Sequence, residues 1–201
     1  MKQKKHIIGC YNKTVILTYI GAAASLLGIF MVKNGDIAMI CLIVAGICDL
    51  FDGRIARRCE RTEQEKQFGV MIDSLADVVS FLIFPCAILF EFGGQTLFSY
   101  VIGVLYMLAG IIRLGWFHIT TEEKIEYYQG LPVTYSALVI AIVYAVCQFF
   151  PPFCFSWLIC GIYPVMAFLF LWNVRIKKPV GIWYGVFSLL AVLTVIVILL
   201  F

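Results

Sequence analysis

Charged residues are scarce in this sequence. Only 13% of its 201 residues are Asp, Glu, Lys or Arg, whereas 63% are hydrophobic, and the mean hydropathy is +0.99. A soluble domain of this length needs a far more polar surface. The composition therefore excludes an ordinary soluble domain and indicates a membrane protein.

Cysteine-based metal motifs and an ATP-binding motif are also missing. The 8 cysteines are scattered, mostly inside apolar runs, and no C-x-x-C or Cys/His spacing occurs. Zinc sites and disulfide frameworks depend on such spacings. No ATP-binding motif, internal repeat or low-complexity segment is present either. We interpret the cysteines as small buried apolar side chains.

Seven apolar runs have the length of membrane spans. A helix needs roughly 20 apolar residues to cross about 30 Å of hydrocarbon. On that template the predicted fold is an all-α, polytopic transmembrane helix bundle, and residues 1–201 form a single domain. The predicted spans are residues 14–32, 36–57, 68–91, 96–117, 131–149, 153–173 and 180–201. The first run is interpreted as a retained span that follows a basic segment, residues 1–13.

The positions of the cations predict how the bundle is oriented. If the amino terminus is cytoplasmic, fourteen of the fifteen Lys and Arg residues lie at or near the inner side, and only Lys33 lies outside. This bias is the positive-inside pattern. It predicts a multi-pass protein of the cell (inner) membrane, with the loop between the second and third spans in the cytoplasm.

Four acidic residues fall inside the predicted spans: Asp49, Asp52, Asp73 and Asp77. Each carboxylate costs roughly 2.5–3.5 kcal/mol at a helix centre on insertion scales. The other eight acidic residues fall in loops or near span ends and are interpreted as surface charge. A set of four acids inside spans therefore predicts a functional site.

Helical geometry gathers these acids on two stripes. At about 100° per residue, Asp49 and Asp52 share one face of the second span, and Asp73 and Asp77 share one face of the third. Both stripes reach roughly 12 Å from the cytoplasmic side at 1.5 Å per residue. Facing each other, they would form a pocket of four carboxylates open to the cytoplasm.

Carboxylates this close cannot all stay ionised without cations. Hard oxygen ligands without His or Cys select Mg²⁺, Mn²⁺ or Ca²⁺ over zinc or copper. Two divalent ions would balance the four charges and suit a phosphoryl-type transfer. The sequence therefore predicts a carboxylate metal site.

Small residues and one arginine accompany the acids. Gly53, Ala56 and Gly69 lie on the same stripes and admit two interpretations, room for a nucleotide or close helix packing. Arg57 is interpreted either as a partner for a phosphate or ligating carboxylate, or as a positive-inside anchor. Both alternatives remain open from the residues alone.

Together these residues spell D-x-x-D-G-x-x-A-R over residues 49–57 and G-x-x-x-D-x-x-x-D over residues 69–77. This pattern resembles the signature of the CDP-alcohol phosphatidyltransferases, with all eight defining positions filled. The resemblance implies a homodimeric bundle with a six-helix core, here residues 14–173, followed by an extra helix at 180–201. It also implies transfer of a phosphatidyl group from a CDP-linked lipid to an alcohol, with release of CMP.

The resemblance also implies roles for single residues. Asp49, Asp52 and Asp73 would be metal ligands, and Asp77 would both bind metal and act as general base on the acceptor hydroxyl. The CDP-lipid site would be lined by Gly53, Ala56, Arg57 and Gly69. The expected cofactor is Mg²⁺ or Mn²⁺, with two ions. The expected partners are CDP-diacylglycerol, the acceptor, the bilayer and a second copy of the chain, with no nucleic acid.

The acceptor is indicated by a downstream stretch. Arg113-Leu-Gly-Trp-Phe-His118, followed by Gly130-Leu-Pro132-Val, is similar to the phosphatidylserine synthase branch of the family, which implies L-serine. Within the same class, glycerol 3-phosphate or an inositol compound are the alternatives. Arg113 is interpreted as binding the lipid phosphate or the acceptor; the alternative is a cation that snorkels to the interface.

A cation or proton transporter is the alternative from a different class, because intramembrane carboxylates also serve as ion relays. Against it, the acids cluster at one depth near one face, with no continuation towards the outer side.

Overall fold

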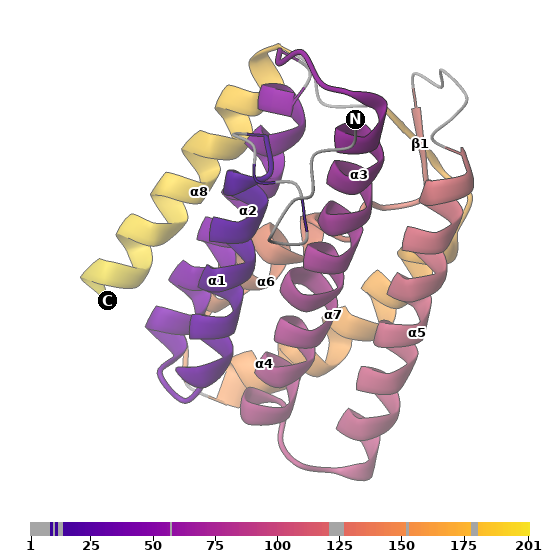
Figure 1. Cartoon of the computed structure of the whole chain (residues 1–201). Helices are drawn as coiled ribbons and strands as arrows, with labels where there is room; N and C mark the ends of the chain where they lie inside the picture. Colours follow the sequence, from indigo (N-terminus) through magenta and orange to yellow (C-terminus); the bar gives the residue numbers. More distant parts are fainter. Residues whose placement is uncertain are drawn as a thin grey trace.

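The structure, a computed structural model, describes residues 9, 11, 14–56, 58–120, 127–151, 153–177 and 181–201. Helices make up most of it (Figure 1). In chain order the elements are α1 (Ile16–Phe30), α2 (Gly35–Ala56), α3 (Glu63–Asp77), the π-helix η1 (Val78–Ile83), α4 (Phe84–Phe92), α5 (Leu97–Thr120), β1 (Tyr127–Gln129), α6 (Tyr135–Cys147), α7 (Phe153–Leu171), β2 (Arg175–Lys177) and α8 (Ile182–Leu200).

The predicted all-α bundle is confirmed. Because α3, η1 and α4 run on as one helix, Glu63–Phe92, the described residues form seven helical segments. Each segment falls on one predicted span. The third begins five residues earlier than predicted, since its polar first turns lie before the apolar run.

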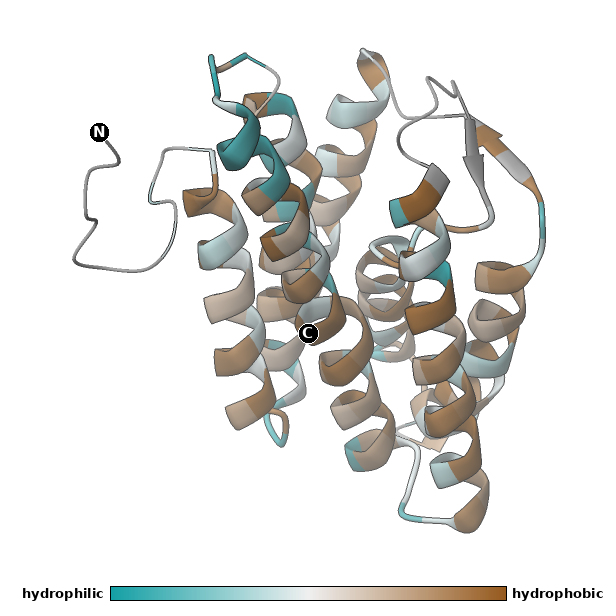
Figure 2. Cartoon of the chain, turned by 45° about the vertical axis from the view of Figure 1, so that its right-hand side comes forward, coloured by the Kyte–Doolittle hydropathy of each residue, from teal (hydrophilic) through white to brown (hydrophobic). Residues whose placement is uncertain are grey.

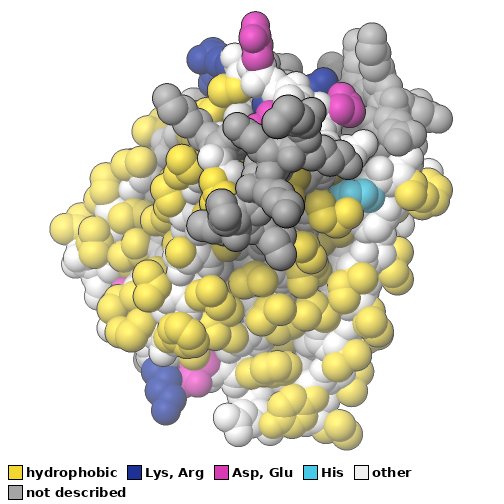
Figure 3. All heavy atoms as spheres, viewed as in Figure 1, with side chains coloured by type: hydrophobic (Ala, Val, Ile, Leu, Met, Phe, Trp, Pro, Cys, Tyr) yellow, Lys and Arg dark blue, Asp and Glu magenta, His cyan; other side chains and the backbone are white. Residues whose placement is uncertain are grey.

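Four segments are long and apolar enough to cross a membrane by length and composition: Glu63–Phe92, α5, α7 and α8. The apolar helices α1 and α6 are shorter, and α2 carries three aspartates and Arg54. Hydrophobic residues dominate the helices in Figure 2, and hydrophilic ones gather around the end of α2 and the start of α3. On the face seen in Figure 3, charged side chains likewise lie at the two ends of the bundle, and apolar ones cover the middle. The chain is a membrane protein.

The packing places α2 at the centre of the arrangement. α1 packs along α2, α6 packs on α2, and α8 packs on both α2 and α6, while α5 pairs with α7. α1 also contacts α3 and η1. The core between these helices is apolar, and its largest fully buried side chains include Tyr106, Tyr163, Phe81 and Phe84.

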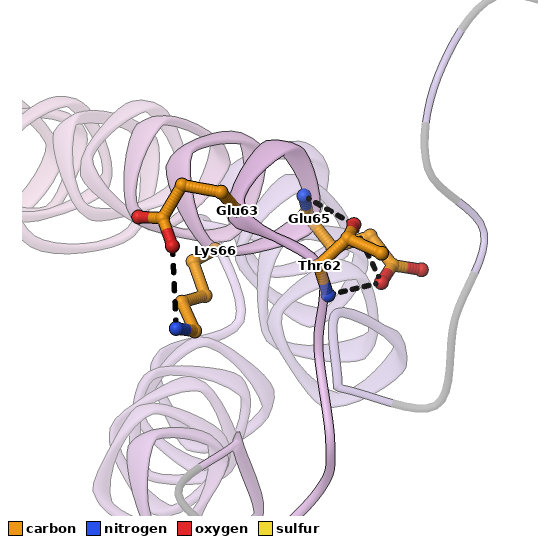
Figure 4. Close-up of polar contacts among 4 residues, drawn as sticks. All are labelled: Thr62, Glu63, Glu65 and Lys66. Atoms are coloured by element: carbon orange, nitrogen blue, oxygen red, sulfur yellow. Dashed lines mark hydrogen bonds and ion pairs between the residues drawn. The ribbon is translucent and has the colours of Figure 1, made fainter.

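The start of α3 is fixed by a capping box (Figure 4). Thr62 accepts a hydrogen bond from the N–H of Glu65 at 3.3 Å, and the N–H of Thr62 donates to Glu65 at 2.9 Å. Such a cap stabilises a helix end by about 1 kcal/mol. An exposed ion pair, Lys66 with Glu63 at 3.3 Å, lies beside it and contributes little. The cap sets the turn from which the helix runs to Asp73.

Two short strands, which the sequence did not predict, pair the segment before α6 with the segment after α7. β1 and β2 pair antiparallel, with Tyr128 opposite Ile176. Beyond the strand, the N–H of Gly130 donates to the carbonyl of Val174 at 2.8 Å. Gly130 has φ +82°, and a Cβ there would lie 2.8 Å from the Phe170 carbonyl, so glycine is required. This turn fixes the segment that leads into α6.

Candidate functional site

The four intramembrane aspartates come together between α2 and α3. Asp49, Asp52 and Asp73 each offer a carboxylate oxygen, and these oxygens all lie within 4.8 Å of one another. Asp77, about one helical turn after Asp73 on α3, is outside this set of three. Two helical stripes therefore converge as their periodicity predicted.

A cavity of about 290 Å³ opens on this cluster. All four aspartates line it, and its remaining wall comes from α2, α5, α6, α8 and the turn before α6. Asp52 is the most enclosed acid, with 6% of its surface exposed, and the other three are partly buried. The cluster thus lies at the wall of an accessible cavity inside the bundle.

α1 contributes a hydrogen bond that sequence reasoning missed. Thr18 Oγ1 donates to Oδ2 of Asp52 at 2.9 Å, and Thr18 is buried. One hydroxyl in an apolar run gave no signal, because its partner lies 34 residues further along the chain. The bond fixes the orientation of one carboxylate oxygen.

α8 also contributes to the site. Tyr184, Phe187 and Ala191 line the cavity, and the guanidinium of Arg54 lies 5.0 Å from the centre of the Tyr184 ring. Arg54 occupies an unspecified position of the signature, so the pattern did not single it out. The contact joins the last helix to the segment that carries Asp52.

The predicted small residues divide into two groups. Gly53 lines the cavity, whereas Ala56 and Gly69 are not part of its wall. A Cβ on Gly69 would meet only Arg61 Nη1, at 3.5 Å, which is an ordinary contact. Close packing therefore does not explain Gly69. Arg57 lies outside the described residues.

Arg113 lies at the same cavity, on α5. Only 5% of its surface is exposed, so it is not a snorkelling interfacial cation. Its Nε donates to the carbonyl of Leu131 at 3.3 Å and an Nη to that of Gly130 at 3.4 Å, and its guanidinium lies 5.8 Å from the centre of the Phe117 ring. The stretch that begins at Arg113 and the stretch that begins at Gly130, on which the acceptor prediction rests, are therefore in direct contact.

The aspartate set fits a divalent cation. Oxygen ligands bind Mg²⁺ or Ca²⁺ at 2.0–2.6 Å, so two ligands of one ion are at most about 4–5 Å apart. The 4.8 Å separation of the three carboxylate oxygens falls in that range. No His or Cys belongs to the set among the described residues, so the donors are all hard oxygens. The cluster could hold a metal ion.

A sequence model of the family described as CDP-alcohol phosphatidyltransferase matches residues 12–201. The chain is 40% identical over 114 residues to a protein named CDP-diacylglycerol–serine O-phosphatidyltransferase from Saccharomyces cerevisiae, covering 52% of this chain and 40% of the relative. A Helicobacter pylori protein of the same name is 33% identical over 122 residues (58% and 50%). An archaetidylserine synthase from Methanothermobacter thermautotrophicus is 31% identical over 134 residues (64% and 56%). The matches thus span about half the length of these relatives.

Proposed function

The chain belongs to the CDP-alcohol phosphatidyltransferase family, and we propose that it transfers the phosphatidyl group of CDP-diacylglycerol to L-serine, giving phosphatidylserine and CMP. The names of its relatives support serine as the acceptor. The observation that carries the proposal is the meeting of Asp49, Asp52 and Asp73 at a cavity that Arg113 also lines.

The aspartates are proposed to hold two divalent ions, Mg²⁺ or Mn²⁺. Asp49, Asp52 and Asp73 would be ligands, and Asp77 would complete the set. When bound, the ions would offset negative charge on the diphosphate and on the leaving CMP. Thr18 would keep one oxygen of Asp52 occupied by a hydrogen bond, which leaves the other oxygen for a cation.

Asp77 is proposed as the general base. The serine hydroxyl oxygen attacks the phosphorus that carries the diacylglycerol, and its proton passes to the Asp77 carboxylate. The bond from that phosphorus to the CMP oxygen breaks. A positioned base of this kind contributes typically about 10²–10⁴-fold to the rate. The diphosphate is already activated, so the reaction needs no ATP.

The walls of the cavity are proposed to divide between the two substrates. Gly53, on the cavity wall, would face the cytidine diphosphate group, and the other signature residues, Ala56, Arg57 and Gly69, would contact the part of this group that extends beyond the wall. Arg113 would bind the lipid phosphate or the acceptor carboxylate, since its fork is held rigidly by two backbone carbonyls. Apolar side chains of α2, α6 and α8 complete the cavity wall.

We propose that the cavity faces the cytoplasm of a cell membrane and that the enzyme works as a homodimer. The distribution of Lys and Arg along the sequence supports this orientation. The end of α2, the start of α3 and β1 lie at one end of the bundle, at the top of Figure 1. A water-soluble acceptor would then reach the site from that end.

A detergent-micelle assay tests the reaction. The purified protein receives CDP-diacylglycerol, Mn²⁺ or Mg²⁺, and one acceptor at a time: L-serine, glycerol 3-phosphate or an inositol compound. We expect CMP release with serine and none without a divalent ion. CMP release with only one of the other alcohols would identify that alcohol, rather than serine, as the acceptor. No CMP release with any alcohol would refute the enzyme assignment.

A further inference from the structure

The helix that carries Asp73 and Asp77 contains a π-helical turn directly after the second aspartate. η1 spans Val78–Ile83, and the N–H of Phe84 bonds to the carbonyl of Val79, five residues back rather than four. A π-helical turn contains one extra residue. The helix segment before the turn is therefore rotated relative to the segment after the turn by roughly a quarter of a turn. The direction in which both aspartates point therefore depends on η1.

Pro85 provides a physical cause for this turn. In an α-helix the N–H of residue 85 would bond to the carbonyl of Phe81, but proline has no N–H and its ring crowds that carbonyl. Widening to five-residue bonds relieves the crowding. Because Pro85 has no N–H, the carbonyl of the fully buried Phe81 lacks its α-helical donor and needs one from another helix.

α5 supplies that donor. The hydroxyl of Tyr106 donates to the Phe81 carbonyl at 2.7 Å, and Ser136 Oγ of α6 lies 3.5 Å from the same oxygen. Both side chains are fully buried. α5 can approach this closely because Gly110 faces Leu82, with which any Cβ would collide. The widened turn is thus held from outside its own helix.

We propose that Tyr106 is a positioning residue of the transfer reaction: by bonding to the Phe81 carbonyl it holds η1 in the register that turns Asp73 and Asp77 towards α2. Tyr106 is not part of the cavity wall, so it acts through the helix. The inference rests on the proposed function only for what the aspartates do once they are in place.

Tyr163 offers a matched control. Its ring lies 4.8 Å from that of Tyr106, it is equally buried, and its hydroxyl donates to the carbonyl of Pro85 at 2.6 Å, just beyond η1. Tyr106→Phe and Tyr163→Phe therefore each remove one buried hydroxyl and keep the ring. A purely structural role predicts the same behaviour from both variants.

The experiment measures Mn²⁺ binding from the loss of the free Mn²⁺ signal in electron paramagnetic resonance, together with kcat and KM. We expect Tyr106→Phe to weaken Mn²⁺ binding and lower kcat, each about 10-fold, at unchanged KM for both substrates. Tyr163→Phe should bind Mn²⁺ as the unaltered protein does. Equal Mn²⁺ binding in all three proteins, or equal losses in the two variants, would overturn the proposal.

Pro85→Ala supplies a second, independent arm. It restores an N–H for the Phe81 carbonyl, so η1 should tighten to an α-helix and Mn²⁺ binding should fall at least as far. Adding Tyr106→Phe should then change nothing more, because the carbonyl already has its donor. Additive losses would contradict the shared mechanism. Since Mn²⁺ binding needs no turnover, absence of CMP release would refute the proposed function without deciding this inference.

Discussion

Thr18 on the first helix donates a 2.9 Å hydrogen bond to Oδ2 of Asp52 on the second, and both side chains are buried. α1 packs along α2 and also contacts α3. α1 therefore packs against both helices that carry the acidic cluster. A helix without a signature residue takes part in the site through this bond.

Removing the Thr18 hydroxyl should weaken metal binding. Thr18→Val keeps the shape of the side chain but frees Asp52 to rotate, so we expect about 10-fold weaker Mn²⁺ activation. Thr18→Ser keeps the donor and should stay close to the unaltered protein. The measurement is the Mn²⁺ concentration that gives half-maximal CMP release. Identical values for the valine and serine variants would show that the bond has no such role.

Asp77→Asn should abolish turnover while nucleotide binding largely survives. The amide keeps the size of the carboxylate but cannot accept the serine proton, so we expect a loss of about 100-fold or more. CMP release gives turnover, and calorimetric titration with CDP-diacylglycerol in micelles gives binding. Near-normal turnover in this variant would rule out the base assignment.

Asp36 serves as a control for the site aspartates, because it lies on α2 but away from the cluster. It lies in the first turn of α2, at the other end of that helix from Asp49 and Asp52, and it accepts hydrogen bonds from Tyr144 at 2.8 Å and Gln148 at 3.2 Å. Asp36→Asn should therefore lower the free energy of unfolding by about 1 kcal/mol and leave turnover unchanged. Thermal unfolding in detergent, run beside the CMP assay, measures both.

Arg113→Lys should impair the reaction although it keeps the charge. An ammonium group cannot reproduce the fork that donates to the carbonyls of Gly130 and Leu131. We expect kcat/KM to fall about 10-fold. The KM for serine and for CDP-diacylglycerol, measured separately, shows which substrate the guanidinium contacts. A lysine variant with unchanged kinetics for both would contradict a role in substrate binding.

Tyr184→Ala should weaken binding of the lipid substrate. The change removes the ring beside Arg54 and opens the α8 wall of the cavity, so we expect the KM for CDP-diacylglycerol to rise roughly five-fold, the equivalent of about 1 kcal/mol. Trp183→Ala is the control, because Trp183 is 53% exposed and is not part of the cavity wall. Equal effects of the two changes would argue for a general loosening of α8 instead.

The sequence predicted those features that depend on local periodicity. The 3.6-residue repeat placed Asp49 with Asp52 and Asp73 with Asp77, and equal depth predicted that the two pairs meet. Hydropathy predicted each of the seven helical segments. Each of these features can be predicted from the sequence of single helices and from their positions relative to the membrane surface.

Features that depend on contacts between distant helices were not predicted. Thr18, Arg54 and Tyr184 stand out only once α1, α2 and α8 are packed together. The π-turn had one local signal, Pro85 within an apolar span, but its donor Tyr106 lies on another helix. Single-helix periodicity carries no information on such partners.

The most direct test of the central claim is to follow both products at once in proteoliposomes. With isotopically labelled serine, CDP-diacylglycerol and Mn²⁺, one labelled phosphatidylserine should form for each CMP released, and Asp77→Asn liposomes should form neither. Lipid mass spectrometry and nucleotide chromatography count the two products. Release of CMP without labelled lipid, or no release from folded protein with the divalent ion present, would contradict the account.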